Sequence, residues 1–247
     1  MSLIEADART LLERIPDRSI DLVVTDPPYV FDRRGGAGIN AFQEWFPELA
    51  DEEWPRIFEQ LYRVLRGNRH AYVFADRRVR DLFQAAAVDA GFKVRGPLIW
   101  DKLSIGPGGT WRPSYEFILW LTKGTPRRGA HRNRRDVLQA PRIRGGYPTE
   151  KPVLVLRSLI EQGSRPGELV LDPFCGSGNV GKAARELSRR CLLGDVDAAA
   201  AAARLRLAFV GLEADGALRS ALRATGEESV ARSAELRPID VTESDDR

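Results

Sequence analysis

Short apolar runs alternate with helix-favouring segments along most of this chain, and this alternation limits the folds that it can adopt. The apolar runs have the composition of buried strands, and they occupy residues 20–26, 70–75, 97–100, 115–121, 168–172 and 191–196. The segments between them show helical character and cover residues 54–65, 79–91, 151–163, 179–188 and 197–211. Strands that alternate with helices predict an α/β fold with a mostly parallel sheet.

Two capping residues and two long connections refine this organisation. Gly67 follows the helical segment 54–65 and is expected to end it, while Asp197 is placed to cap the helix that follows it. Residues 31–50 and 124–147 are longer than ordinary connections. Long loops inside a compact domain usually carry function or are disordered.

The length of 247 residues suits one large domain or two small ones. We expect a single domain over residues 1–225, into which a segment at about 124–147 is inserted. From Gly226 the chain is polar and has no periodic pattern. Residues 226–247 are therefore expected to form a disordered tail.

Composition argues against several classes of protein. No apolar run approaches the roughly 20 residues that cross a bilayer, and the N-terminal residues lack the apolar region of a secretory signal. The chain has two cysteines, too few for a disulfide framework or a structural zinc site. His70 and His131 do not have the spacing of metal ligands. We therefore expect a cytoplasmic protein without a membrane segment or a metal site.

The positive charge of the chain is unevenly distributed. The formal net charge is only +3, but between Arg127 and Arg144 seven arginines accompany a single aspartate. Such an excess in a loop without periodic pattern favours contacts with the phosphates of a nucleic acid. Trp45 and Phe46, in the other long loop, are further candidates for such contacts, although packing against their own helix explains them nearly as well.

The segment LVLDPFCGSGNVGKAA, residues 169–184, joins an apolar run to a helix through a glycine-rich turn. Its glycines match the dinucleotide fingerprint GxGxxG, and Asp195 stands about 20 residues downstream, where a ribose-binding acid belongs. They also match the phosphate loop GxxxxGK, except that Ala183 replaces the Ser or Thr that binds magnesium. A third interpretation is a turn that binds a nucleoside without phosphate.

Several features favour this third interpretation. Asp172 ends the strand just before the turn, where a carboxylate repels phosphate and attracts an ammonium group. Ala183 argues against an NTPase, so Lys182 is interpreted as a solvated helix residue rather than a phosphate ligand. A dinucleotide fold also places its fingerprint near the start of a domain, whereas only about 70 residues follow here.

The segment IDLVVTDPPYVF is the second unusual feature. A predicted buried strand ends at Asp26, and Pro27 and Pro28 then hold the chain extended. Tyr29 follows at the carboxyl end of the strand, which is where ligands bind in open α/β sheets. The Asp26 carboxylate and the Pro27 carbonyl both accept hydrogen bonds, and Tyr29 offers a flat face. This arrangement suits a planar base that carries an exocyclic amine.

The order of the motifs resembles the β-type DNA amino-methyltransferases over roughly residues 3–211. The motifs that carry the resemblance are SIDLVVTDPPY, IWDK, YEFILWLTKG, YPTEKP and VLDPFCGSG. The resemblance implies a Rossmann-like methyltransferase fold with a seven-stranded, mostly parallel sheet, circularly permuted so that the chain begins near the third strand. It also implies S-adenosyl-L-methionine (AdoMet) as the cofactor and double-stranded DNA as the substrate, methylated on the exocyclic amine of adenine or, less often, cytosine.

The resemblance further implies which residues act. The expected catalytic residues are Asp26, Pro27, Pro28 and Tyr29. The expected cofactor-binding residues are Asp7, Ala8, Thr149, Lys151, Asp172, Phe174, Cys175, Gly176, Ser177, Gly178, Asn179, Asp195 and Val196. Independently of the resemblance, the residues expected to contact DNA are Arg33, Arg34, Arg127, Arg128, Arg132, Arg134, Arg135, Arg142 and Arg144.

Three departures from the family pattern bear on the geometry of the cofactor site. Asn179 stands where the family usually has Thr, and Tyr147 replaces the usual His before Pro-Thr. In LGDVD the glycine, Gly194, is shifted by one position relative to the common pattern. Lys151, in YPTEKP, is interpreted equally well as a surface residue and as a neighbour of the methionine end of the cofactor.

The expected function is that of a DNA (adenine-N6)-methyltransferase. The target adenine must leave the duplex, and Tyr29 would then stack on it. Asp26 and the Pro27 carbonyl would hold its amine for direct transfer, with most of the rate coming from positioning. Asp195 would bind the ribose hydroxyls of the cofactor and Asp7 its adenine amine.

Three other functions are considered. Cytosine-N4 transfer uses the same geometry, and the Asp before Pro-Pro favours adenine only as a family tendency. An NAD-dependent oxidoreductase would need a His or a Lys–Tyr pair, and none is suitably placed. A catalytically silent DNA-binding protein would keep the arginines, but the intact DPPY argues against it. The sequence leaves a homodimer and a restriction endonuclease partner open.

Overall fold

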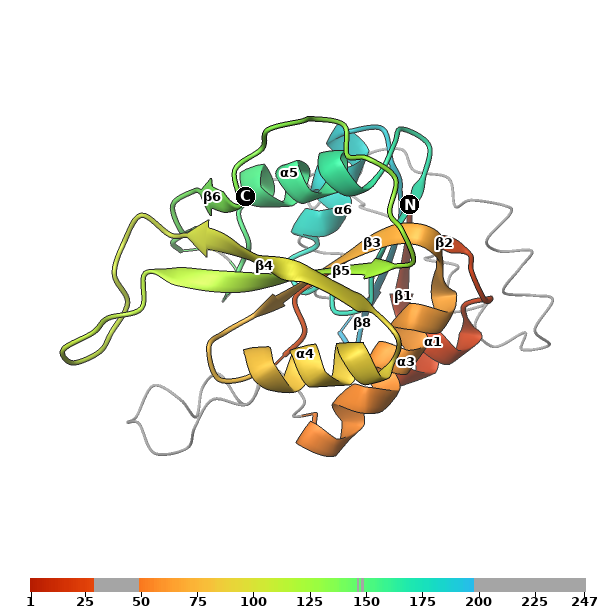
Figure 1. The fold of residues 1–247 in the computed structure, drawn as a ribbon, viewed down its shortest axis with the longest axis horizontal. Helices are drawn as coiled ribbons and strands as arrows, with labels where there is room; N and C mark the ends of the chain where they lie inside the picture. The colour runs from red at the N-terminus through yellow and green to blue at the C-terminus, as the bar shows by residue number, and fades with distance from the viewer. Residues whose placement is uncertain (29–48, 146, 148, 198–247) are drawn as a thin grey trace, which may run out of the picture.

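The computed structural model describes residues 1–28, 49–145, 147 and 149–197 of the chain. The described residues form an α/β structure around an eight-stranded sheet (Figure 1). The strands are β1 (Ser2–Glu5), β2 (Ile20–Thr25), β3 (Leu65–Ala75), β4 (Lys93–Asp101), β5 (Tyr115–Lys123), β6 (Val137–Gln139), β7 (Leu169–Asp172) and β8 (Arg190–Asp195). The α-helices are α1 (Ala8–Arg14), α3 (Trp54–Val64), α4 (Arg80–Asp89), α5 (Val153–Gly163) and α6 (Asn179–Glu186), and a 3₁₀ turn, η1 (Asp51–Glu53), precedes α3.

The sheet has the strand order β1-β8-β7-β2-β3-β5-β4-β6. All neighbouring pairs are parallel except those of β5, which runs antiparallel to both β3 and β4. The prediction of seven strands is therefore corrected to eight. The additional strand, β6, is a three-residue edge strand that pairs with Ile99–Asp101 of β4. It lies inside the segment 124–147, whose sequence has no strand pattern.

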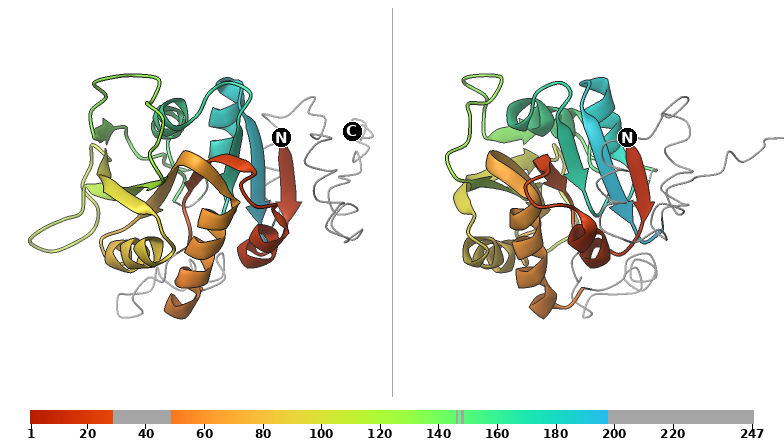
Figure 2. Two further views of the ribbon diagram at one scale, coloured as in Figure 1. Left: turned by 45° about the vertical axis from the view of Figure 1, so that its right-hand side comes forward. Right: turned by 90° about the vertical axis from the view of Figure 1, so that its right-hand side faces the viewer.

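The helices cover the sheet on both faces (Figure 2). One face carries α1, α3 and α4, whose apolar side chains form a core with β2, β3 and β5. The other face carries α5 and α6, which pack on a second core. Helix α3 shows why helices cover the sheet: its apolar side chains recur at helical spacing and are buried on one side. The ring centroid of Trp54 lies 4.5 Å from that of Phe83 in α4. Buried on both faces, the central strand β2 is apolar over most of its length.

The predicted cap at Gly67 is wrong. Helix α3 ends at Val64, and the backbone of Leu65 is already extended, so β3 begins at that residue. Leu65 pairs with Ile20 of β2, which draws the chain into the sheet before it reaches Gly67. The helix predicted over 197–211 and the tail 226–247 lie outside the described residues, apart from Asp197. No helix in the described part of the chain is long and apolar enough to cross a membrane.

The sheet order brings the ends of two distant strands together. Strands β2 and β7 are parallel neighbours with Leu22 opposite Val170. From β7 the sheet continues to β8 on one side, whereas from β2 it continues to β3 on the other. Such a reversal of strand order opens a crevice at the carboxyl ends of the strands, where ligands bind in open α/β sheets. Asp26 follows β2 and Asp172 is the last residue of β7, so both lie at that crevice.

Candidate active site

The glycine-rich turn between β7 and α6 is shaped by two glycines with left-handed backbone. Gly176 has φ +45° and Gly178 has φ +78°, a conformation that costs glycine little because it has no Cβ. The amide of Gly176 donates a hydrogen bond of 2.7 Å to the Asp195 carboxylate, and that of Cys175 donates to the Gly194 carbonyl at 2.8 Å. The turn is therefore fixed to the end of β8, and Asp195 is in contact with the turn as the spacing of the sequence implies.

Tyr147, Glu150 and Lys151 lie against this turn. A Cβ atom on Gly176 would lie 2.9 Å from a ring carbon of Tyr147, so the bare glycine permits the close approach of the aromatic ring. The amide nitrogen of the Asn179 side chain donates to the Glu150 carboxylate at 2.7 Å and to the Lys151 carbonyl at 3.0 Å. Asn179 is the first residue of α6, so its side chain joins the helix to Glu150 and Lys151.

Asp172 is buried beneath the turn. Its Oδ1 atom accepts a hydrogen bond from the Thr25 hydroxyl at 2.7 Å and another from the Phe174 amide at 3.1 Å. Only 2% of the residue is exposed, and burial raises the pKa of its carboxyl group to about 7. Burial thus favours the neutral form of this carboxyl group and opposes the charged form.

Four charged side chains alternate in sign beside Asp172. Lys151 forms an ion pair with Asp26 Oδ2, and its Nζ lies 3.4 Å from Glu116 Oε2. The other oxygen of Glu116 lies 2.7 Å from Lys102 Nζ. Lys151 is 5% exposed, so of the two interpretations of this residue the exposed surface position is wrong. We call the four residues Lys102, Glu116, Lys151 and Asp26 the charge chain.

Asp26 is the last member of the charge chain and lies at the crevice. Burial raises the pKa of its carboxyl group to about 6, against the opposing effect of the Lys151 ammonium. Its Oδ1 atom is buried and has no hydrogen-bond partner among the described residues. A buried acceptor without a partner is costly in a folded protein and indicates a place for a ligand donor.

Glu116 and Lys102 were not among the predicted site residues. Both lie in motifs that carry the family resemblance, YEFILWLTKG and IWDK. The available signal was Glu116 itself, since a carboxylate inside an apolar strand is seldom buried without a charged partner. The partner could not be found from the sequence because it depends on where Lys151 lies in the fold.

A narrow pocket and a wide cleft meet at this site. The pocket encloses about 50 Å³ and is lined by Asp26, Thr25 and Phe74 together with eight of the residues expected to bind the cofactor, namely Thr149, Lys151, Asp172, Phe174, Cys175, Gly176, Ser177 and Asn179. The cleft encloses about 1150 Å³. Tyr147, Thr149 and Glu150 line both, so the two spaces share a wall.

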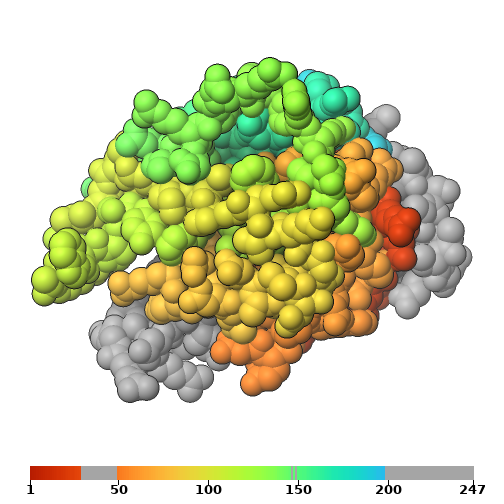
Figure 3. All heavy atoms as spheres, viewed as in Figure 1, coloured from red at the N-terminus to blue at the C-terminus, as the bar shows by residue number. Residues whose placement is uncertain are grey.

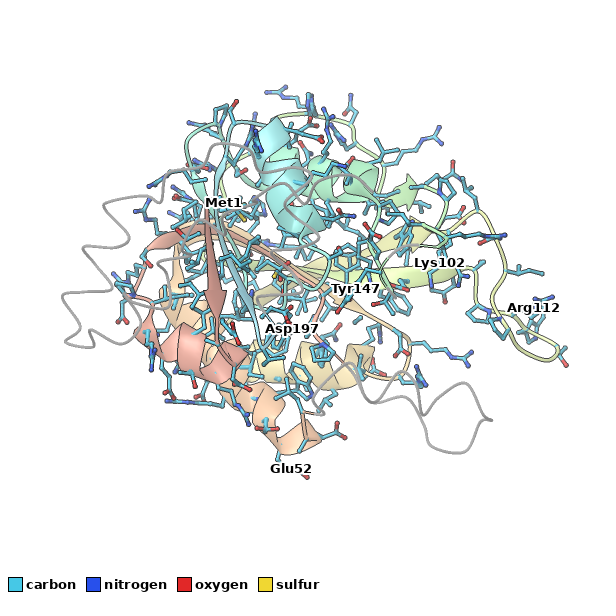
Figure 4. All side chains as sticks on the ribbon, turned by 180° about the vertical axis from the view of Figure 1, so that it is seen from behind. Met1, Glu52, Lys102, Arg112, Tyr147 and Asp197 are labelled. Carbon is cyan, nitrogen blue, oxygen red and sulfur yellow. The ribbon has the colours of Figure 1, made fainter. Side chains whose placement is uncertain are left out.

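The connection between β4 and β5 forms one side of the cleft. Figure 3 shows this arm, residues 102–114, projecting beyond the body of the molecule, and Figure 4 shows Lys102 at its base and Arg112 far along it. Trp111 on the arm is 89% exposed. The cleft is lined by six basic residues, which are Arg77, Arg78, Lys102, Arg112, Arg142 and Arg144.

The seven arginines of the Arg-rich segment, residues 127–144, lie in different surroundings. Arg142 and Arg144 line the cleft, as expected of residues that meet a polyanion. Arg127 instead pairs with Glu168, and Arg134 pairs with Glu161 and donates to the Ser158 hydroxyl at 2.9 Å. Helix α5 thus holds part of the segment. The remaining predicted arginines of this segment are exposed and do not line the cleft; they are Arg128, Arg132 and Arg135.

The other predicted site residues are placed as follows. Asp7 caps helix α1 and pairs with Arg9, whose hydrogen bonds lower the pKa of the carboxyl group. Ala8 is buried in α1, Gly178 belongs to the turn, and Val196 is 44% exposed just after β8. Pro27 and Pro28 follow Asp26 outside any helix or strand, and Pro27 is buried. Tyr29, Arg33 and Arg34 lie outside the described residues, as do Trp45 and Phe46.

Comparison with known proteins gives these features a common context. A family model described as DNA methylase matches residues 20–217. The protein named methylase YubD of Escherichia coli (strain K12) is 34% identical over 194 residues, which cover 76% of this chain and 81% of that protein.

Solved structures share the fold. The structure of TTHA0409 from Thermus thermophilus, named as a DNA modification methylase and complexed with S-adenosyl-L-methionine, is 25% identical with a TM-score of 0.63, covering 85% of this chain and 96% of that one. The cytosine-N4-specific PvuII DNA methyltransferase has a TM-score of 0.68 at 18% identity, covering 91% and 93% of the two chains. The cofactor is therefore AdoMet, and the chain belongs to the N6/N4 family of AdoMet-dependent DNA methyltransferases.

Proposed function

We propose that this protein transfers a methyl group from AdoMet to the N6 amine of a flipped-out adenine in double-stranded DNA. The observation that carries the proposal is the position of Asp26. Its unpartnered, buried Oδ1 belongs to a residue that lines the narrow pocket, and Lys151 links that residue to Glu116 in the wall of the cationic cleft. An acceptor at the junction of a cofactor site and a DNA site is suited to hold an amine.

The residues around the pocket fit the cofactor. The backbone of the glycine turn lines the pocket at Gly176, and Asp172 offers a carboxyl group that an ammonium can neutralise. Because the pocket is narrow, we place the methionine part of AdoMet there and the adenosine part along the turn toward Asp195 and the exposed Val196. Bound in this way, AdoMet supplies an electrophilic methyl group.

The protein's own contribution to the chemistry is positioning. Asp26 Oδ1 and the Pro27 carbonyl accept the two N–H groups of the target amine and so direct the nitrogen lone pair. Flipping the base costs a few kcal/mol, and stacking on Tyr29 returns about 1–3 kcal/mol. Holding the reactants in a reactive geometry is worth about 7–11 kcal/mol at most, so the site needs no covalent bond to the protein.

DNA is proposed to occupy the cleft, with its phosphates near Arg77, Arg112, Arg142 and Arg144 of the cleft wall. The other two basic residues of the wall, Arg78 and Lys102, are paired with Asp76 and Glu116. The width and charge of the cleft support this location. Arg127 and Arg134 are given a structural role instead, because their charges are paired with glutamates of the same chain.

With DNA as the substrate, we propose that the protein acts in the cytoplasm. A homodimer and a restriction endonuclease partner stay predictions.

Cytosine-N4 transfer is the second candidate, and the shared fold of the cytosine-N4-specific PvuII enzyme favours considering it. The test is incubation with methyl-labelled AdoMet and DNA of mixed sequence, followed by analysis of the nucleosides. We expect label in N6-methyladenine. Label in N4-methylcytosine would replace the first candidate by the second, and no label in either base would refute both.

Substitution of Asp26 tests the role of the carboxylate. Asp26→Ala should abolish methyl transfer, because the amine loses its acceptor, but should leave the dissociation constant for AdoMet within a few-fold of the wild-type value. Glu186→Gln is a matched control, because Glu186 pairs with Arg157 on the surface, away from the site. Normal transfer by Asp26→Ala would contradict the proposed mechanism.

A further inference from the structure

The charge chain connects the cleft to the narrow pocket. Lys102 and Glu116 line the cleft, whereas Lys151 and Asp26 line the pocket. The side chains of Glu116 and Lys102 are 15% and 14% exposed, and that of Lys151 is 6% exposed. Two cations thus alternate with two anions in a place largely shielded from water, where such charges interact more strongly than they do on the surface.

Glu116 shares the ammonium group of Lys151 with Asp26. A buried ammonium needs a carboxylate partner, but Asp26 alone already supplies one through Oδ2. Glu116 Oε2 brings a second carboxylate oxygen to 3.4 Å, an ion-pair contact without a hydrogen bond, and Lys151 Nζ donates to the Thr149 carbonyl at 3.2 Å. These contacts hold the ammonium on the Oδ2 side of Asp26, while Oδ1 keeps no partner among the described residues.

We propose that Glu116 is a positioning residue for Asp26: by holding Lys151 on Oδ2, it keeps Asp26 Oδ1 available for the target amine. The inference rests on the proposed function, and it adds a residue that touches neither the cofactor nor the base. Without the Glu116 charge, Lys151 would pair with Asp26 alone. The ammonium could then approach both carboxylate oxygens, and the amine would compete with it for Oδ1.

Glu116 and Lys102 have opposite effects on the pKa of the Asp26 carboxyl group. Besides burial and Lys151, the negative charge of Glu116 raises the pKa of Asp26, and the positive charge of Lys102 lowers it. Glu116→Gln should therefore lower the pKa of the Asp26 carboxyl group, by about one unit for a single nearby charge. Lys102→Met should raise it, because the substitution removes a positive charge that lowers it.

The experiment measures the pKa of the Asp26 carboxyl group directly, in the absence of DNA and AdoMet. Protein labelled with ¹³C in the aspartate carboxyl groups is titrated by NMR, and the Asp26 signal is assigned by its loss in Asp26→Asn. We expect a lower pKa in Glu116→Gln, a higher pKa in Lys102→Met, and the wild-type value in the surface control Glu186→Gln. An unchanged pKa in Glu116→Gln, or a shift of the same sign in both variants, would overturn the inference. Should Glu116→Gln fail to fold, the upward shift in Lys102→Met decides alone.

Kinetics give the second measurement. Glu116→Gln should lower kcat about tenfold or more, as expected of a misplaced reacting group, with the dissociation constant for AdoMet unchanged. Glu116→Asp, which keeps the charge, should recover part of the loss. A loss of AdoMet binding equal to the loss of kcat would indicate a merely structural role and refute the positioning role. If the wild-type protein methylates no DNA, the proposed function fails, while the NMR titration still tests the charge chain.

Discussion

Replacing Asp172 by Asn should make the protein's stability less dependent on pH. Both hydrogen bonds to this carboxyl group, from the Thr25 hydroxyl and the Phe174 amide, end on Oδ1. An Asn side chain keeps an oxygen at that position and cannot ionise. The substitution therefore removes the titration of a buried acid while preserving its two partners.

The magnitude follows from the pKa of Asp172. In the folded protein it is raised from 3.8 to about 7, chiefly by burial. Because the folded state holds the proton more tightly, stability is greatest below the unfolded pKa and falls as pH rises from about 4 to about 7. At 1.36 kcal/mol per pKa unit, the wild-type protein should lose about 4 kcal/mol over this window, of which about 2.5 kcal/mol is lost between pH 5 and pH 8.

The assay is urea unfolding of both proteins at pH 5, 6, 7 and 8, without AdoMet. The free energy of unfolding of Asp172→Asn relative to the wild-type protein should rise by about 2.5 kcal/mol from pH 5 to pH 8. Any constant cost of the amide cancels in this difference. Asp89→Asn, at the exposed end of α4, serves as the control. A difference that stays constant with pH, or falls, would refute the account of a buried acid at this position.

Two further changes test the fold and the cleft. Gly194→Ala should destabilise the protein by about 1–3 kcal/mol in urea unfolding, because its Cβ would overlap a methyl carbon of Leu11; unchanged stability would contradict the packing. Arg142→Ala should weaken binding to all DNA sequences and reduce the slope of log affinity against log salt by about 0.9, whereas Arg134→Ala should leave the slope unchanged. The reverse result would place DNA along residues 127–135 rather than in the cleft.

Much of the fold could be predicted from local patterns. The apolar runs became strands β2, β3, β4, β5, β7 and β8, because a strand buried on both faces must be apolar along its length. The acids at the ends of β2 and β7 could be placed together for the same reason, since parallel strands carry their carboxyl ends to one edge. The short strand β6 escaped detection because three residues form no pattern.

Charge partners could not be predicted, because they depend on contacts between distant segments. The sequence shows seven arginines between 127 and 144, but it does not show that Glu161 and Glu168 meet two of them. Similarly, Glu116 lies on a strand that is antiparallel to both of its neighbours, and only this arrangement brings it beside Lys151. A count of charges thus overestimates the surface that is available to a polyanion.

The geometry of the site also explains why the target amine is easier to identify than the target base. Adenine and cytosine both present an exocyclic NH₂ group, and Asp26 Oδ1 with the Pro27 carbonyl would accept the same two hydrogen bonds from either. Discrimination must then come from walls that meet the rest of the ring, which is larger in adenine. Of the described residues, Tyr147, Thr149 and Glu150 line both the pocket and the cleft, and Tyr147 is the aromatic residue among them. It also stands where the family usually has His, so the base choice of this protein need not follow that of its relatives.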